Sequence, residues 1–214
     1  ILTVDNGISA HEGVEAAEAA GIGVVVTDHH LPGETLPSAL AIVNPQVAST
    51  AFEGRHLAGV GVCFYVLLAT RARLRAEAWF GDARPEPNLA EHLDLVALGT
   101  VADVVPLDRV NRLLVEQGLR RIRSGRATPG ILALLDAAGR DPACVNATDL
   151  GFGAAPRLNA AGRLDDMSLG IETLLAADPA TARQCAGRLE RLNQERRHLE
   201  REMRDTAVAD VEAE

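Results

Sequence analysis

An acid and two adjacent histidines follow a short apolar stretch near the start of the chain. Residues 23–27 are Gly-Val-Val-Val-Thr, a pattern typical of a buried strand in a parallel sheet, and Asp28, His29 and His30 come directly after them. In open α/β sheets, ligands bind beyond the carboxyl ends of the strands. This strand would therefore present a carboxylate and two imidazoles where a metal ion or a phosphate could bind. Two histidines in a loop are more often simply solvated, so the interpretation needs matching groups from other segments.

Asp5 is the first matching group. Residues 1–4 form a short β-type run that ends in the turn signal Asp5-Asn6-Gly7, and residues 11–20 are Ala/Glu-rich and predict a helix. A strand, a helix and a second strand within about 30 residues form a βαβ unit, in which the two strands are parallel. Both strands then end at the same edge of the sheet, which gives Asp5 and Asp28 equivalent positions.

Asp103 is the second matching group, because it lies inside the otherwise apolar segment 99–106. Burial of an unpaired carboxylate is costly, so Asp103 is either a metal ligand or a partner in a helix cap or salt bridge. Carboxylates and imidazoles without cysteine suit Mn²⁺ or Mg²⁺ better than a structural zinc ion. Two such cations about 4 Å apart activate a water and stabilise the leaving oxygen in phosphoryl transfer. The residues indicate metal-assisted hydrolysis of a phosphate ester or anhydride.

Two later segments carry arginines that could bind phosphate. Residues 109–126 predict a helix with a basic outer face, and residues 155–164 are interpreted as a small-residue loop that carries Arg157, Asn159 and Arg163. Guanidinium groups bind phosphate bidentately. Solvated arginines without a ligand remain the alternative for both segments.

The other predicted elements are a third strand and several helices. The sequence predicts the strand at 41–43 and helices at 57–74, 89–98 and 128–138. From Asp178-Pro179 onward, apolar residues at four- and three-residue spacing predict a long, charged helix, which we interpret as a strut to another domain.

Composition limits the possible partners and location. The formal net charge is -9 and every basic residue other than histidine is an arginine, which argues against nonspecific coating of nucleic acid but not against a nuclease with clustered acidic metal ligands. The three scattered cysteines favour reduced thiols in the cytoplasm. No apolar run approaches the roughly 18 residues of a membrane span, and no signal peptide is evident.

Five segments taken together resemble the ordered motifs of a known family. The chain is similar to the DHH phosphoesterase superfamily, and within it to the single-stranded-DNA-specific exonucleases of bacteria. The motifs are Val-Asp-Asn-Gly-Ile-Ser at 4–9, Thr-Asp-His-His-Leu-Pro-Gly at 27–33, Leu-Ala-Gly-Val-Gly-Val at 57–62, Ala-Leu-Gly-Thr-Val-Ala-Asp-Val-Val-Pro-Leu at 97–107 and Pro-Arg-Leu-Asn-Ala-Ala-Gly-Arg-Leu at 156–164.

The resemblance implies a reaction, a cofactor and roles for the site residues. It implies 5′→3′ removal of nucleotides from single-stranded DNA with two Mn²⁺ or Mg²⁺ ions, in DNA repair and recombination. By motif, Asp5 would be shared between the metals, and His29 and Asp103 would be further ligands. His30 would be a ligand or lie close to the scissile phosphate, and Asp28 would orient the histidines.

The resemblance also implies partners. Arg157, Asn159 and Arg163 match the motif expected to contact the DNA backbone. The expected partner is single-stranded DNA, with single-stranded-DNA-binding protein and other recombination proteins implied by the family. We expect a monomer without a membrane association.

The implied fold is α/β, with a parallel-sheet core, helices on both faces, a helical subdomain and a long connecting helix. We expect a catalytic domain over 1–178, with its helical part from about residue 89, and a helix over 179–214 that leads to a second domain. The family's first motif, an Asp-x-Asp pair, would precede Ile1, so we expect this chain alone to be nearly inactive. The alternatives are a manganese pyrophosphatase, an oligonucleotide phosphodiesterase or a noncatalytic DNA-binding relative.

Overall fold

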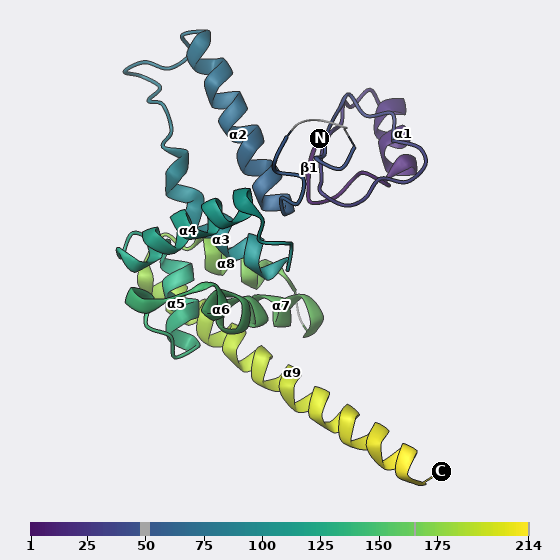
Figure 1. Cartoon of the computed structure of the whole chain (residues 1–214), viewed down its shortest axis with the longest axis vertical. Helices are drawn as coiled ribbons and strands as arrows, with labels where there is room; N and C mark the ends of the chain where they lie inside the picture. Colours follow the sequence, from purple (N-terminus) through teal and green to yellow (C-terminus); the bar gives the residue numbers. More distant parts are fainter. Residues whose placement is uncertain (48–51, 165, 214) are drawn as a thin grey trace. The chain divides into compact units, whose positions relative to one another are not determined.

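The chain divides into two compact units. The computed structural model describes residues 1–47, 52–164 and 166–213. The first unit comprises Ile1–Gly118 and the second comprises Leu119–Glu214 (Figure 1). The division falls within one helix, α4, rather than at residue 89 or 178, where the sequence places its boundaries.

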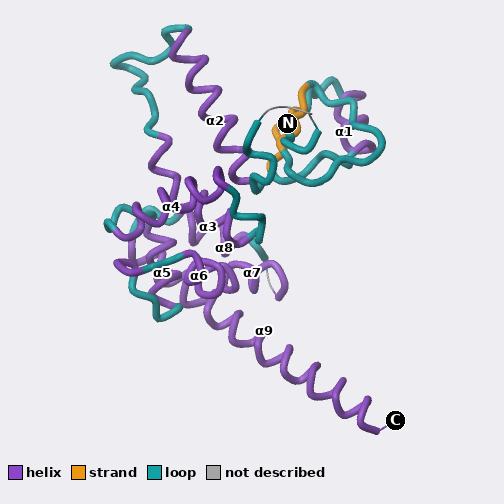
Figure 2. The backbone as a smooth tube through the Cα atoms, in the orientation of Figure 1, coloured by secondary structure: helices purple, strands orange, loops and turns teal. Residues whose placement is uncertain are grey.

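A parallel sheet of three strands begins the first unit. The strands are β1 (Leu2–Val4), β2 (Val25–Thr27) and β3 (Ala41–Val43), in the order β1-β2-β3 (Figure 2). Hydrogen bonds continue one residue past the strands, from the Asp5 amide to the Thr27 carbonyl (3.0 Å) and from the Asp28 amide to the Val43 carbonyl (3.1 Å). The predicted βαβ unit is confirmed, and Asp5 and Asp28 follow the carboxyl ends of neighbouring strands.

Apolar side chains fix the helix between β1 and β2 against the sheet. Helix α1 (His11–Ala19) contributes Val14 and Ala17 to a buried cluster with Val24 and Val26. Burial of each valine side chain in this cluster contributes about 1.5–3 kcal/mol to the stability of the fold. This packing holds the strand that carries Asp28.

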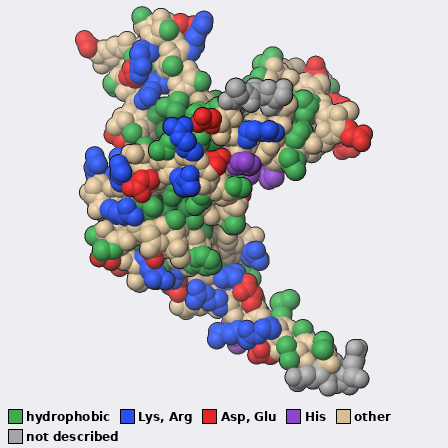
Figure 3. Space-filling view, viewed as in Figure 1, with side chains coloured by type: hydrophobic (Ala, Val, Ile, Leu, Met, Phe, Trp, Pro, Cys, Tyr) green, Lys and Arg blue, Asp and Glu red, His purple; other side chains and the backbone are tan. Residues whose placement is uncertain are grey.

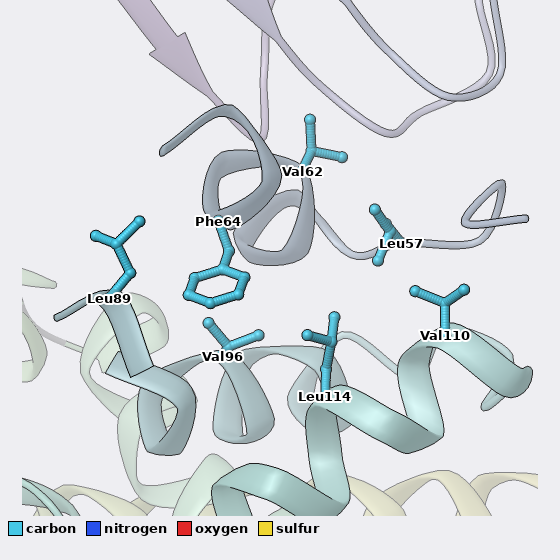
Figure 4. Packing of buried hydrophobic residues seen from close by; sticks show 7 residues of the cluster. All are labelled: Leu57, Val62, Phe64, Leu89, Val96, Val110 and Leu114. Atoms are coloured by element: carbon cyan, nitrogen blue, oxygen red, sulfur yellow. The ribbon is translucent and has the colours of Figure 1, made fainter. Parts of the chain in front are cut away.

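A second core connects the sheet to the helical part of the first unit. It is formed by α2 (Gly59–Ala76), the short 3₁₀ helix η1 (Leu89–His92), α3 (Leu93–Ala102) and α4 (Arg109–Arg123). Figure 4 shows its buried side chains, which are Leu57, Val62, Phe64, Leu89, Val96, Val110 and Leu114. Helix α2 packs on β1, β2 and α3, so the end of α3, where Asp103 lies, is fixed relative to the sheet.

The described part of the second unit is entirely helical outside its loops. Its elements are α5 (Pro129–Ala137), η2 (Pro142–Cys144), α6 (Ala147–Asp149), η3 (Leu150–Ala154), α7 (Ala155–Leu164), α8 (Ser168–Leu175) and α9 (Pro179–Ala213). Helix α9 packs on α5, α7 and α8, and its residues Ala182, Ala186, Leu189 and Asn193 are buried. The predicted α/β class, the helical part and the long C-terminal helix are confirmed. The first half of α9 is, however, part of this unit's core and not only a strut.

The prediction of a loop at 155–164 is wrong, because these residues form α7. Pro156 and the small residues favoured the loop interpretation. Pro156 has no N–H to donate to the turn that precedes it, which would disfavour a regular α-helix there. The preceding residues form a π-helical turn, η3, a wider helix that runs directly into α7.

Gly130 lies at a close approach between α5 and α8. A Cβ atom at this position would overlap the backbone of Thr173 and Leu174. We expect Gly130→Ala to lower the free energy of unfolding of the second unit by about 2 kcal/mol, since backbone must move to make room. Gly187→Ala is the matched control, because a Cβ there meets nothing within 4 Å, and it should leave stability equal or raised. Chemical denaturation followed by circular dichroism checks both variants, and equal stability of the two would contradict the close approach.

None of the described helices is both long enough and apolar enough to cross a membrane.

Candidate metal centre

Two carboxylates converge on one histidine nitrogen in the first unit. The Nε2 atom of His29 lies 3.0 Å from Oδ1 of Asp5 and 3.4 Å from Oδ2 of Asp103. Ligand atoms of Asp5, His29 and His30 all lie within 4.8 Å of one another. The structure thus brings together Asp5, His29, His30 and Asp103, which come from three separate segments of the sequence.

The backbone turns sharply at both carboxylates. Asp5 has a φ of 62°, and Val104, directly after Asp103, has a φ of 59°. Aspartate adopts this left-handed conformation more readily than most residues, whereas a β-branched valine is strained there. Val104 is 86% exposed, so no apolar burial of its side chain explains the conformation. Strain of this kind concentrates at functional sites.

The donor atoms fit a divalent cation. The Nε2 atom of His29 is buried and makes no hydrogen bond with the described residues, although a buried nitrogen of this kind normally has a partner. Neighbouring ligands of an octahedral cation at about 2.1 Å lie roughly 3 Å apart, which is the spacing of Nε2 and the Asp5 carboxylate. Oxygen and imidazole donors without a thiolate are the set that suits Mn²⁺ or Mg²⁺.

The surroundings of Asp103 raise its pKa. Burial raises the pKa of Asp103, the nearby His29 and His30 rings lower it, and the negative charge of Asp5 raises it further. Its side chain is 35% exposed, so it is accessible from one side. Two carboxylates that face one another without a cation repel, and a bound cation would remove that repulsion.

Asp28 lies behind the two histidines and holds the loop that carries them. It is 1% exposed, and its oxygens accept hydrogen bonds from the amides of Ile8 (2.9 Å), His29 (2.8 Å) and His30 (3.2 Å). Its Oδ1 atom also lies 2.7 Å from Nδ1 of His30. Burial would raise the pKa of Asp28, but these hydrogen bonds outweigh burial and lower it.

The contact with Asp28 also changes the pKa of His30. The hydrogen bond that His30 donates to Asp28 is the main reason that the pKa of His30 is raised; burial opposes the shift, and the charges of Asp28, Asp5 and Asp103 add to it. His30 remains 60% exposed. Because Nδ1 faces Asp28, Nε2 is the atom left for a ligand.

Two residues that position the site were not identified from the sequence. A Cβ atom at Gly59, the first residue of α2, would overlap the carboxylate of Asp5, so only glycine leaves room for this side chain. Asn44, just past β3, is buried, and its Nδ2 donates to the His30 carbonyl (2.9 Å). Its place after a strand end, like that of Asp5 and Asp28, is a signal that could have revealed it.

The structure leaves two of the three predicted DNA-contact residues exposed on the second unit and buries the third. Asn159 and Arg163 are exposed and lie four residues apart on α7, which puts them on one face of the helix. Arg157 is 6% exposed, and its guanidinium donates to the carbonyls of Gly153 (2.6 Å) and Ala137 (3.0 Å).

Arg157 also lies 2.6 Å from the Glu190 carboxylate on α9. A guanidinium held by three internal partners is not available to a backbone phosphate, and the prediction that Arg157 contacts DNA is therefore wrong for this placement. It depended on the loop interpretation of residues 155–164. As an interior residue of a helix, Arg157 instead connects α7 to α9.

We expect Asp28→Asn to loosen the histidine loop. An asparagine keeps the size of the side chain but replaces one accepting oxygen with a donor, so one of the amide hydrogen bonds is lost. This should lower the free energy of unfolding by about 2 kcal/mol and shift the pKa of His30 down toward its ordinary value. Nuclear magnetic resonance titration of the histidine rings in the presence of a chelator measures the pKa. An unchanged pKa of His30 would contradict the contact with Asp28.

Comparisons with known proteins match a family model, sequence relatives and solved structures. The model of the DHH family, N-terminal domain, matches residues 1–100. The chain is 60% identical to the single-stranded-DNA-specific exonuclease RecJ of Dickeya dadantii (strain 3937) and 57% identical to RecJ of Escherichia coli (strain K12), in each case over 209 residues. Each match covers 97% of this chain and 36% of the relative, so the chain spans about a third of the length of these proteins.

Solved structures are similar in the same region. A crystal structure of exonuclease RecJ bound to manganese matches with a TM-score of 0.80 and 39% identity, covering 94% of this chain and 48% of that one. A crystal structure of RecJ from Thermus thermophilus in complex with Mg²⁺ matches with a TM-score of 0.68 and 34% identity, covering 94% of this chain and 26% of that one. Residues 1–100 thus match the DHH family, N-terminal domain, and the chain as a whole is similar to RecJ exonucleases in sequence and structure.

Proposed function

We propose that this chain forms the metal-binding part of an exonuclease that removes nucleotides 5′→3′ from single-stranded DNA. The observation that carries the proposal is the convergence of the Asp5 and Asp103 carboxylates on the buried Nε2 atom of His29, which makes no hydrogen bond with the described residues. The relatives named as single-stranded-DNA-specific exonucleases support the substrate. Solved relatives with Mn²⁺ and with Mg²⁺ support the cofactor.

Asp5, His29 and Asp103 would hold divalent cations, with His30 as a further ligand or as a contact of the scissile phosphate. When bound, the cations supply an activated water and neutralise charge on the phosphate. Of the cations that fit the donor set, we propose two Mn²⁺ or Mg²⁺ ions.

The chain's own residues position the reacting groups. Asp28 fixes the orientation of His30 through Nδ1, which leaves Nε2 able to hold a proton near a phosphate or leaving oxygen. The glycine at position 59 lets the Asp5 carboxylate occupy its place without a steric overlap.

Asn159 and Arg163 on the exposed face of α7 are the proposed contacts to the DNA backbone. An amide and a guanidinium both donate to phosphate oxygens without reading the base. A DNA substrate places the proposed activity in the bacterial cytoplasm, in repair and recombination. Single-stranded-DNA-binding protein and a monomeric state remain expectations from the family.

The test compares substrates in the gene product that carries this chain. With Mn²⁺, a 5′-labelled single strand should release mononucleotides from its 5′ end, while a blunt duplex is spared and excess chelator stops the reaction. Faster hydrolysis of pyrophosphate or of dinucleotides than of long single strands would contradict the proposal and favour the other phosphoesterase activities. Tight DNA binding without any metal binding would favour a noncatalytic role.

A further inference from the structure

A stripe of arginines lies on α9 beyond the part of this helix that packs in the second unit. The stripe consists of Arg197, Arg201 and Arg204, which follow Asn193, the last of the described side chains of α9 that is buried. Their spacing of four and three residues puts them on one face, over about 10 Å of helix. Together with Glu200 they line a hollow of ≈ 370 Å³. Figure 3 shows basic side chains gathered along this part of the long helix.

The positive charge of the stripe is only partly compensated. Glu200 pairs with Arg196, and Arg204 lies 3.1 Å from Asp205. Within the described residues, neither Arg197 nor Arg201 makes an ion pair, while Nε of Arg201 donates to the Arg197 carbonyl (3.1 Å). That bond restricts the Arg201 side chain while its terminal nitrogens remain free to bind a ligand.

The positive potential extends to α7. Burial is the main reason that the pKa of Arg157 is lowered; Glu190 opposes the shift, whereas Arg197 and Arg140 add to it. Arg197 is therefore close enough to the interior Arg157 for its positive charge to lower the pKa of Arg157. A chain with a net charge of -9 thus carries a local positive surface on this unit, which indicates an anionic partner and not a general affinity for polyanions.

We propose that Arg197, Arg201 and Arg204 bind consecutive phosphates of a single-stranded nucleic acid. The proposal rests on the proposed exonuclease function, which supplies the substrate class. Guanidinium forks match the paired oxygens of phosphate. Among the described residues no aromatic side chain lines the hollow, so bases would not stack on an aromatic ring there and binding would not depend on sequence.

The test is the affinity of the full chain for a fluorescently labelled oligothymidylate of 20 nucleotides, measured by anisotropy with excess chelator. The double variant Arg197→Glu with Arg201→Glu should bind about tenfold more weakly than the unaltered chain. A plot of log Kd against log salt concentration should have a slope that is smaller for this variant than for the unaltered chain. The slope should fall by about 0.7 for each phosphate that the variant no longer neutralises.

The double variant Arg188→Glu with Arg191→Glu is the matched control. It makes the same change of charge on the same helix, at exposed positions that do not line the hollow. Its affinity should change less than twofold. An equal loss in both variants would show an effect of net charge alone and would overturn the stripe as a site, as would unchanged affinity in the first variant. Stronger displacement by polyglutamate than by unlabelled oligothymidylate would also overturn it, in favour of an acidic protein partner.

The chelator separates this proposal from the proposed function. Loss of hydrolysis with intact binding to the stripe would overturn only the catalytic proposal. Intact hydrolysis with no effect of the first variant on DNA affinity would overturn only the stripe.

Discussion

In the gene product that carries this chain, His29→Ala is expected to lower kcat for manganese-dependent hydrolysis of single-stranded DNA by about a thousandfold. The substitution removes the Nε2 atom on which the Asp5 and Asp103 carboxylates converge, and leaves those carboxylates facing one another. The loss corresponds to about 4 kcal/mol of transition-state stabilisation, within the range that a bound cation supplies. Steady-state rates at saturating Mn²⁺ give the comparison.

His198→Ala is the control for His29→Ala. His198 is an exposed histidine on α9, 66% exposed and 3.4 Å from Glu202. Its loss removes a ring of the same chemistry from a place without converging carboxylates, and the rate should stay within twofold. A His29→Ala variant that keeps more than a tenth of the activity would remove His29 from the metal centre.

Arg157→Met is expected to lower the free energy of unfolding of the second unit by about 3 kcal/mol. The side chain of Arg157 is 7% exposed and that of Glu190 is 23% exposed, so the substitution leaves a largely buried carboxylate without its partner. Removal of one member of a buried ion pair is strongly destabilising, whereas replacement of both by apolar residues is often nearly neutral. The double variant Arg157→Met with Glu190→Leu should therefore recover most of the lost stability.

Hydrogen exchange of the α7 and α9 amides measures this effect separately from the first unit. A surface arginine that contacts DNA would behave differently, because Arg157→Met would then weaken DNA binding and leave stability within about 0.5 kcal/mol. That outcome would restore the prediction made from the sequence. Recovery in the double variant would instead establish the internal role.

The metal centre was predictable because its residues follow elements with strong local signals. Asp5 and Asp28 end two strands of a βαβ unit, and the parallel direction of such strands brings their ends together. The residues around Asp103 in the sequence did not distinguish a metal ligand from a helix cap or a salt-bridge partner. Its Oδ2 atom lies 3.4 Å from Nε2 of His29, which supports the proposed role as a ligand.

The remaining features depend on contacts that no local pattern contains. Residues 155–164 have the small residues and proline of a loop, yet they continue a π-helical turn as α7, and Glu190 meets Arg157 only because α9 packs on this helix. The role of Gly59 likewise requires the approach of α2 to β1, since glycine near the start of a helix is common without any close neighbour.

Diffraction from crystals grown with Mn²⁺, recorded at the manganese absorption edge, tests the metal centre most directly. The anomalous map should contain a peak about 2.2 Å from Nε2 of His29 and within the same range of the Asp5 and Asp103 carboxylates. The same map from His29→Ala crystals should show that peak lost or much weakened. A map of the unaltered chain without a peak between these three side chains, at a Mn²⁺ concentration that supports hydrolysis by the gene product that carries it, would contradict the assignment of this cluster as the metal centre.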